Sequence, residues 1–144
     1  MVSLESVTTT WNDGSSNWKD IPGLTTYSQG NVGQDVNGKS NTDTIVAFAK
    51  SSGQVYRAAQ YCHDKTTGGK TWYLPAVGEM WSMRTNYSII KAPLSKVGTG
   101  SLDGYHWSSD KYYDSSAWVL TPNTTYLTTY GQTSNFLVRC IFAY

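Results

Sequence analysis

Hydrophobic side chains recur with a helical period in the middle of the chain. The clearest helix is expected over about residues 54–64, where one face carries apolar residues spaced i, i+3, i+4 and i+7. These residues are Val55, Ala58, Ala59 and Cys62. A shorter apolar stripe after Asn41 predicts an earlier helix. Another helix is expected from Pro75 to about residue 86, because proline is tolerated in a first helical turn.

From residue 105 onward the pattern changes to short extended runs. Strands are expected at four places. They are residues 105–109, 117–121, 126–130 and 135–142. Residues 1–40 are polar and rich in turns, which predicts short strands and loops there. Neither an internal repeat nor a linker is visible, so the pattern predicts one α+β domain over residues 1–144.

Tryptophan and tyrosine are unusually frequent: the 144 residues include six Trp and eleven Tyr but only three Phe. These side chains join an apolar body to a polar group, which suits half-buried surfaces and interfaces. The formal net charge is +1, and Lys and Arg are scattered singly. This distribution argues against binding to nucleic acid.

Nothing in the sequence indicates a membrane segment. No apolar stretch approaches the roughly 18 residues that a spanning helix needs. The first residues lack the basic and apolar regions of a signal peptide. Two explanations are open: an excised domain whose export signal lay upstream, or a protein that reaches the outside without one, as a phage tail protein does.

Several segments with tryptophan or cysteine follow one another in an order that resembles a known family. In chain order they are Asn41-Thr42, Ala58-Ala59 with Cys62, Gly68-Gly69, Trp72-Tyr73-Leu74-Pro75 with Glu79, residues 105–109, Ala117-Trp118 and Val138-Arg139-Cys140. They resemble bacterial and phage domains of the C-type-lectin-like fold, which terminate adhesins, including collagen-like adhesins. Relatives of that fold include formylglycine-generating enzymes and the phage major tropism determinant. The resemblance covers about residues 41–144 and leaves residues 1–40 unmatched.

The resemblance implies two helices flanking a twisted, mostly antiparallel sheet, with the two chain ends side by side. It also implies an exposed ligand-binding face between Trp107 and Arg139, a stretch that diversity-generating retroelements rewrite in some relatives. C-type lectins join their first helix to their terminal strand, which implies a Cys62–Cys140 disulfide. The alternative is two buried free thiols in a reducing compartment.

The composition of residues 104–135 agrees with a binding face. These residues hold five Tyr, five Ser, six Thr and two Asn. Tyr offers a large contact area at low entropic cost, and Ser and Asn offer adaptable hydrogen bonds, as in antibody paratopes. The alternative is a sheet surface rich in good strand formers. The residues expected to bind the ligand are His106, Lys111, Tyr112, Tyr113, Asp114, Tyr126, Thr128, Tyr130 and Asn135.

The sequence favours no catalytic, metal or cofactor site. It has no Gly-x-Ser-x-Gly segment for a nucleophile, and the closely placed cysteine pair of formylglycine-generating enzymes is missing because Cys62 lies far upstream. His63 and His106 are of the right type for zinc but lack a close-spaced partner, and we expect both at the surface. Thr121-Pro122-Asn123 lacks the carboxylate of a lectin calcium loop, so no calcium is expected.

Five further prominent side chains are expected to serve the scaffold. Glu79 lies in the first turns of a predicted helix, where a negative charge is favourable. Arg139 is expected to make fixed hydrogen bonds on the side away from the ligand. Trp72, Trp107 and Trp118 are expected to fill the core.

The sequence therefore predicts an extracellular or virion-displayed domain that binds a protein receptor or a glycan and is not an enzyme. A structural docking module of a fimbria or tail fibre is the main alternative. A formylglycine-type oxidoreductase is a distant third possibility.

Overall fold

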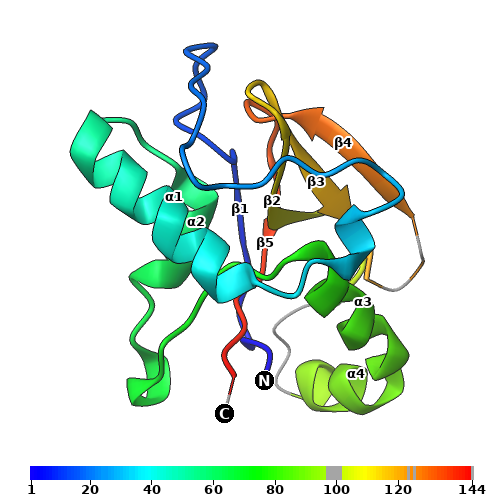
Figure 1. Cartoon of the computed structure of the whole chain (residues 1–144). Helices are drawn as coiled ribbons and strands as arrows, with labels where there is room; N and C mark the ends of the chain where they lie inside the picture. The colour runs from blue at the N-terminus through cyan, green and yellow to red at the C-terminus, as the bar shows by residue number, and fades with distance from the viewer. Residues whose placement is uncertain (97–101, 123, 125, 144) are drawn as a thin grey trace.

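The computed structural model describes residues 1–96, 102–122, 124 and 126–143. In this part of the chain, helices lie on both sides of a five-stranded sheet (Figure 1). The protein is therefore of the α+β class, as the sequence pattern predicts.

The sheet has the strand order β1-β5-β2-β3-β4. Its strands are β1 (Val7–Thr9), β2 (His106–Tyr113), β3 (Ser116–Leu120), β4 (Leu127–Gly131) and β5 (Phe136–Val138). Neighbouring strands are antiparallel except for β5 and β2, which are parallel. Next to the sheet, Val2 forms an antiparallel bridge with Ile141, so the chain ends lie side by side (Figure 1). This arrangement of the ends is the one that the resemblance implies.

The described residues form four α-helices, whereas the sequence pattern predicts three and the resemblance implies two. They are α1 (Gly38–Ser52), α2 (Arg57–His63), α3 (Val77–Thr85) and α4 (Tyr87–Lys96), with short 3-10 turns η1 (Val32–Gln34) and η2 (Thr67–Gly69). Side chains of α1 and α2 share a core with the β2 and β3 residues on one face of the sheet. Helix α3 packs on the other face, against Trp118 and Leu120.

The expected helix over residues 54–64 begins later than its apolar spacing suggests. Gly53 has a φ of 72°, a left-handed conformation that ends α1. Residues 54–56 are not helical, and α2 starts only at Arg57. Val55 therefore lies outside the helix and is 47% exposed, so its expected place on the buried face is wrong. Ala58, Ala59 and Cys62 do lie in the core.

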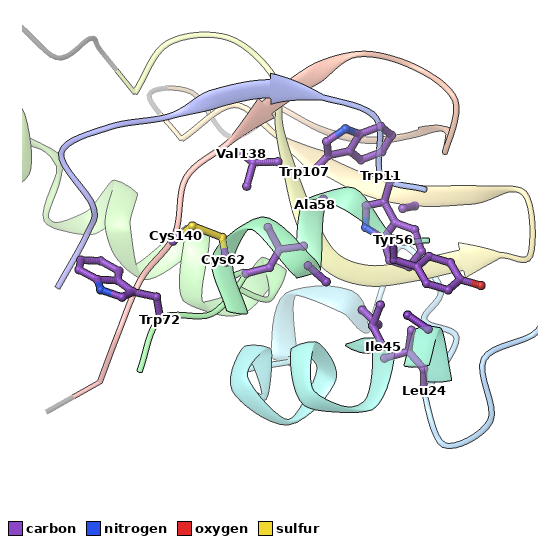
Figure 2. Close-up of a cluster of buried hydrophobic side chains, with 14 of the residues drawn as sticks. Trp11, Leu24, Ile45, Tyr56, Ala58, Cys62, Trp72, Trp107, Val138 and Cys140 are labelled. Carbon is purple, nitrogen blue, oxygen red and sulfur yellow. A yellow bond between two sulfur atoms is a disulfide. The ribbon is translucent and has the colours of Figure 1, made fainter. Parts of the chain in front are cut away.

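Four buried tryptophans donate indole N–H hydrogen bonds, and all of them except Trp72 thereby join distant parts of the chain. Trp11 donates to the Ser108 carbonyl at 2.9 Å, and Trp107 donates to the Thr9 carbonyl at 3.0 Å. Trp72 donates to the Thr67 carbonyl at 2.9 Å and Trp118 to the Tyr27 carbonyl at 3.2 Å. Figure 2 shows three of them, Trp11, Trp72 and Trp107, in the buried cluster with Cys62 and Val138. The expected core role of Trp72, Trp107 and Trp118 is thus confirmed.

The disulfide expected from the resemblance is present. Cys62 on α2 is bonded to Cys140, which follows β5, across a sequence separation of 78 (Figure 2). Both cysteines are completely buried. The alternative of two free thiols is wrong.

Arg139 and Glu79 both belong to the scaffold, as expected. The Arg139 guanidinium donates through Nη1 to the carbonyls of Ser3 and Leu4, at 2.8 and 2.9 Å, and so holds the N-terminal segment against the last strand. Glu79 caps the start of α3 by accepting a hydrogen bond from the Ala76 N–H at 2.9 Å. Neither side chain is directed to the expected binding face.

Candidate ligand-binding face

A group of four aromatic rings extends across one face of the sheet, from Phe136 on β5 and Tyr105 just before β2 to Tyr130 on β4. We call it the aromatic face: Tyr105, Tyr126, Tyr130 and Phe136. The Tyr105 ring centroid lies 6.0 Å from Tyr126, 5.5 Å from Tyr130 and 5.4 Å from Phe136, and Tyr130 lies 4.8 Å from Phe136. Tyr126 is 57% exposed and Tyr130 is 38% exposed. The rings therefore support one another while much of the two β4-side tyrosines remains open to solvent.

The alternation of β4 explains why these side chains come together. Residues two apart on a strand point to the same face, which places Tyr126, Thr128 and Tyr130 on one side. Tyr130 lies opposite Ala117, and Thr128 lies opposite Val119. Ala117 and Val119 are core residues, so this row continues the α1–α2 face of the sheet outward to its edge.

The aromatic face rests directly on the core. Phe136 packs edge-on against the buried Trp107, with ring centroids 5.1 Å apart. Trp107 is in turn fixed by its hydrogen bond to the Thr9 carbonyl. A ring held in this way loses little further freedom when it contacts a ligand, which lowers the entropic cost of binding.

Charge is absent from this part of the chain. The sequence has no Asp, Glu, Lys or Arg between Asp114 and Arg139. Burial, followed by the neighbouring Tyr130 hydroxyl, raises the pKa of Tyr105, so its hydroxyl stays neutral at physiological pH. The face thus offers ring surfaces and neutral hydroxyl groups that can both donate and accept hydrogen bonds. Such a surface suits an uncharged ligand.

His106 and Lys111, which were expected to bind the ligand, are buried and do not belong to an exposed face. His106 is buried, and its Nδ1 lies 3.0 Å from the Gly104 carbonyl oxygen. Burial lowers the pKa of His106 to about 4. The expectation that both histidines lie at the surface is correct only for His63, which is exposed.

Lys111 is buried by a segment far away in the sequence. Thr26 forms a parallel bridge with Lys111, and the lysine Nζ donates to Asp20 Oδ1 at 2.7 Å and to Asp114 Oδ1 at 3.1 Å. Its side chain is only 2% exposed. Lys111 therefore ties the N-terminal loop to the β2–β3 hairpin, and Asp114 serves as one of its partners.

Tyr112 and Tyr113 are separated from the aromatic face. Tyr112 packs edge-on against Trp118, with ring centroids 5.1 Å apart, on the side of the sheet that carries α3. Tyr113 is 60% exposed and contacts Tyr112 at the β2–β3 turn. The nine expected residues thus do not form one continuous surface: only Tyr126, Thr128, Tyr130 and Asn135 lie at or next to the aromatic face.

Sequence reasoning missed Tyr105 and Phe136. Tyr105 directly precedes His106, and Phe136 directly follows Asn135, and both of these neighbours were expected to bind the ligand. The signal was available in the alternation: Tyr105 is two residues before the core Trp107, and Phe136 is two residues before the core Val138. A strict alternation would have preferred Tyr105 to His106.

A pair of buried carboxyl groups lies on the other side of the molecule, where α1 and α3 begin. Asp110 Oδ2 accepts from the Val77 N–H at 2.7 Å, while Asp35 accepts from Asn37 and Asn41, each at 2.8 Å. Burial, and then the hydrogen bond to Asp35, raises the pKa of Asp110 well above its usual range. Burial alone would also raise the pKa of Asp35, but hydrogen bonds from Asp110, Asn41 and Asn37 lower it. A proton shared in this way lets Asp110 donate to Asp35, so the pair joins β2 to both helix starts.

No cation site accompanies these acids. Within the residues that the structure describes, no three His, Cys, Asp or Glu side chains are grouped so that they could hold a metal ion. Backbone and amide donors bind Asp35, and the Val77 N–H binds Asp110 Oδ2. The arrangement is that of a structural hydrogen-bond network.

A concave surface lies where the two chain ends meet. This cavity of about 1020 Å³ is lined by Val2, Trp72, Met83, Ile90 and Phe142, among others. Trp72 and Phe142 pack edge-on at 4.7 Å, and Lys65 and Lys70 lie over these two rings. The lining residues come from four separate stretches of the chain, so no local sequence pattern could have indicated the cavity.

The helices give no sign of membrane insertion. Among the described residues, no helix has both the length and the apolar character needed to cross a bilayer.

Comparison with known proteins identifies a shared fold but no family. No protein-family model matches the chain, and no curated protein sequence matches it either. The chain is similar to the crystal structure of a fimbrial protein from Bacteroides ovatus ATCC 8483, with a TM-score of 0.75 and 16% sequence identity. The likeness covers 96% of this chain and 34% of the fimbrial protein. The chain thus spans about a third of that protein's length, and at this level of identity the comparison establishes the fold alone.

Proposed function

We propose that this chain is a ligand-binding domain of the C-type-lectin-like type that is displayed outside a cell or on a virion. The observation that carries the proposal is the aromatic face, in which partly exposed tyrosine rings rest on a rigid core. Its ligand is an uncharged surface of a protein receptor or a glycan, because the face has hydroxyl groups and rings but no charge.

The architecture supports this proposal. The disulfide joins a helix to the last strand, and the two chain ends meet beside it. Both features are what the resemblance to C-type-lectin-like domains implies. A fold that is held together by the disulfide and the paired chain ends can tolerate many different side chains at the exposed positions near β4, since these side chains do not fill the core. Such tolerance is what a stretch rewritten by a diversity-generating retroelement requires.

We further propose that the chain has no catalytic activity. The two cysteines, the only ones in the sequence, are paired and buried, so neither offers a reactive thiolate. The buried Asp35 and Asp110 face each other and backbone donors, not an opening in the surface.

Alanine substitutions at the aromatic face test the binding proposal. Tyr126→Ala and Tyr130→Ala should each weaken binding to intact host cells or to a glycan array by about 2 kcal/mol or more, as expected at a hot spot. Tyr113→Ala is the matched control, because Tyr113 is equally exposed but lies outside the aromatic face. Binding that is lost in Tyr113→Ala and retained in the two β4-side variants would move the ligand site to the β2–β3 turn.

A structural module of a fimbria is the second candidate, and the fold shared with the Bacteroides ovatus fimbrial protein favours it. In that case the aromatic face would dock against a neighbouring subunit. The two functions differ in a simple assay: a subunit module should incorporate into fimbriae in a manner sensitive to Tyr126→Ala and Tyr130→Ala, and the isolated domain should not bind cells.

The flanking DNA tests whether the stretch is diversified. A near-identical template repeat whose differences fall at adenines, beside a reverse transcriptase gene, would establish a retroelement. Without such a repeat, the domain would be an adhesin with a fixed sequence.

A further inference from the structure

Strand β4 leaves one row of backbone groups free. The Thr121 N–H donates to the Tyr126 carbonyl and the Gln132 N–H donates to the Ser115 carbonyl, so residues 126, 128 and 130 direct their backbone groups to β3. Bonded and non-bonded pairs alternate in antiparallel strands, and residues 127, 129 and 131 therefore direct theirs outward. The Gly131 carbonyl already accepts from the Ser134 N–H at 2.9 Å, so the outward groups open to a further strand are those of Leu127 and Thr129 and the Gly131 N–H. The sheet ends at β4 in the part of the chain that the structure describes. These outward groups are a template for one more strand.

The edge also lacks the features with which proteins usually block such pairing. Natural edge strands carry charges, proline or a bulge, or they are very short. Strand β4 has five residues, Leu127–Gly131, without a charge or a proline, and it pairs with β3 in unbroken register. The other edge strand, β1, is only three residues long. Strand addition is thus favoured at β4 and not at β1.

The sequence of β4 fits a second copy of itself. When two copies run antiparallel about a two-fold axis at Thr129, that residue meets its own counterpart, and Leu127 meets Gly131 of the other copy. The N–H and C=O groups of the two Thr129 residues can then exchange hydrogen bonds, and the Gly131 N–H can donate to the Leu127 carbonyl of the other copy. Threonine pairs are favourable across strands, and the missing side chain of Gly131 leaves room for Leu127. On the opposite side of the strand, Thr128 meets Tyr130, so no like charges or bulky pairs oppose each other.

We propose that this edge is a homodimer interface, in which the β4 strands of two copies pair antiparallel about Thr129 and join their two sheets into one. The two-fold axis runs perpendicular to the sheet, so both aromatic faces lie on the same side. Tyr130 of each copy comes next to Thr128 of the other, which makes the two faces continuous. This interface is independent of what the aromatic face binds, but it presents two such faces together and so raises avidity for a repetitive surface.

Sedimentation equilibrium of the disulfide-bonded chain over a range of concentrations tests the proposal. The parent should form a dimer and no larger species. Thr129→Pro removes an outward N–H that β3 does not use, so the fold should persist while the dissociation constant rises roughly tenfold or more. Thermal melts of dilute samples check that the variant is folded.

Charge substitutions at the axis identify the register. Thr129→Lys and Thr129→Glu each place two like charges opposite one another and should weaken the dimer, whereas an equimolar mixture of the two should associate again. Thr8→Lys is the matched control, since it adds the same charge to the other edge strand, at an exposed position, and should leave the dimer unchanged.

Three results would overturn the proposal. They are a parent that stays monomeric at every concentration, a dimer that Thr8→Lys disrupts and Thr129→Lys does not, and failure of the Lys and Glu variants to associate when mixed. If the parent dimerises but binds neither host cells nor a glycan array, that result would count against the proposed function and not against the dimer. The two proposals can therefore fail separately.

Discussion

The β1–β5 end of the sheet and its β4 end are built in opposite ways. At the β1–β5 end, the disulfide, the Arg139 hydrogen bonds and the Trp107 bond to Thr9 join segments that are far apart in the sequence. At the β4 end, Tyr126 and Tyr130 contact neighbouring rings and stay partly exposed, and the outer edge of the strand pairs with no other strand of the described chain, although Leu127 packs on the core and the Gln132 carbonyl accepts from the Trp11 N–H. In the proposed function, stability and binding are therefore assigned to different parts of one sheet, so that the binding side can change without loss of the fold.

The largest effect is expected at the centre of the clamped region. Trp107→Ala empties a fully buried aromatic site and leaves the Thr9 carbonyl without its donor, so it should lower the free energy of unfolding by about 5 kcal/mol. Denaturant titration measures this loss. If Trp107→Ala unfolds at the same midpoint as the parent, Trp107 is not a core residue and the division is wrong.

The disulfide should have the next largest effect. Loss of a cross-link that closes a loop of 78 residues should cost about 4 kcal/mol in the chain-entropy model. The unfolding midpoint should therefore fall when reductant is added to the parent. The double variant Cys62→Ala with Cys140→Ala serves as the control, and reductant should not affect it. If complete reduction leaves the unfolding midpoint of the parent unchanged, the disulfide contributes little to the free energy of unfolding.

The buried Asp110 should make stability depend on pH. The pKa of Asp110 is raised in the folded protein, so the protonated form is favoured there. Its contribution to the free energy of unfolding is therefore fully present only below the pKa that Asp110 has in the unfolded chain. That contribution is lost as the pH rises through the folded pKa, by at most about 1.4 kcal/mol per pH unit for one proton. Asp35, whose pKa is lowered, acts in the opposite sense and loses its contribution as the pH falls.

Asp110→Asn isolates this effect. Asparagine can still accept from Val77 and donate to Asp35 without a titratable proton, so its stability should fall less between acidic and neutral pH than that of the parent. Asp43→Asn is the control, because Asp43 is an exposed residue on α1. Identical pH profiles for Asp110→Asn and the parent would show that Asp110 does not titrate in the folded state.

The smallest effects are expected at the open end. Tyr126→Ala should change the free energy of unfolding by no more than about 0.5 kcal/mol, since Tyr126 is largely exposed. Tyr130→Ala should cost about 1 kcal/mol, because its ring also contacts Tyr105 and Phe136. Thermal melts check both values. A loss as large as that of Trp107→Ala would make the aromatic face part of the core.

Much of the scaffold could be predicted from the sequence because local patterns and ordered anchor residues determine it. The apolar faces of α1 and α2 and the buried Trp72, Trp107 and Trp118 are of this kind, and the cysteine pairing was implied by the resemblance to C-type-lectin-like domains. The start of α2 was misplaced because apolar spacing continues through Val55, while Gly53 forces the chain out of the helical conformation just before it.

The candidate site was predicted less well, because long-range packing decides which side chains are exposed. All six residues from His106 to Lys111 are buried, since β2 is covered on both faces, and a period of two is therefore invisible there. The register between β2 and β3 also shifts between Trp107 and Lys111 and again before Tyr113, which separates Tyr112 and Tyr113 from the other tyrosines. Strand β4 is covered on one face only, and there the alternation correctly places Tyr126, Thr128 and Tyr130 together.

Residue-resolved hydrogen exchange tests the central division of the sheet most directly. It is best measured on Thr129→Lys, in which two copies cannot pair through β4. The amides of residues 127 and 129 should exchange at nearly the rate of unstructured amides, while those of Thr128 and Tyr130 should be slower, and amides in the central β2 should be protected up to global unfolding. Equal protection of residues 127 and 129 and of β2 would contradict the account, because β4 would then be as firmly held as the rest of the sheet.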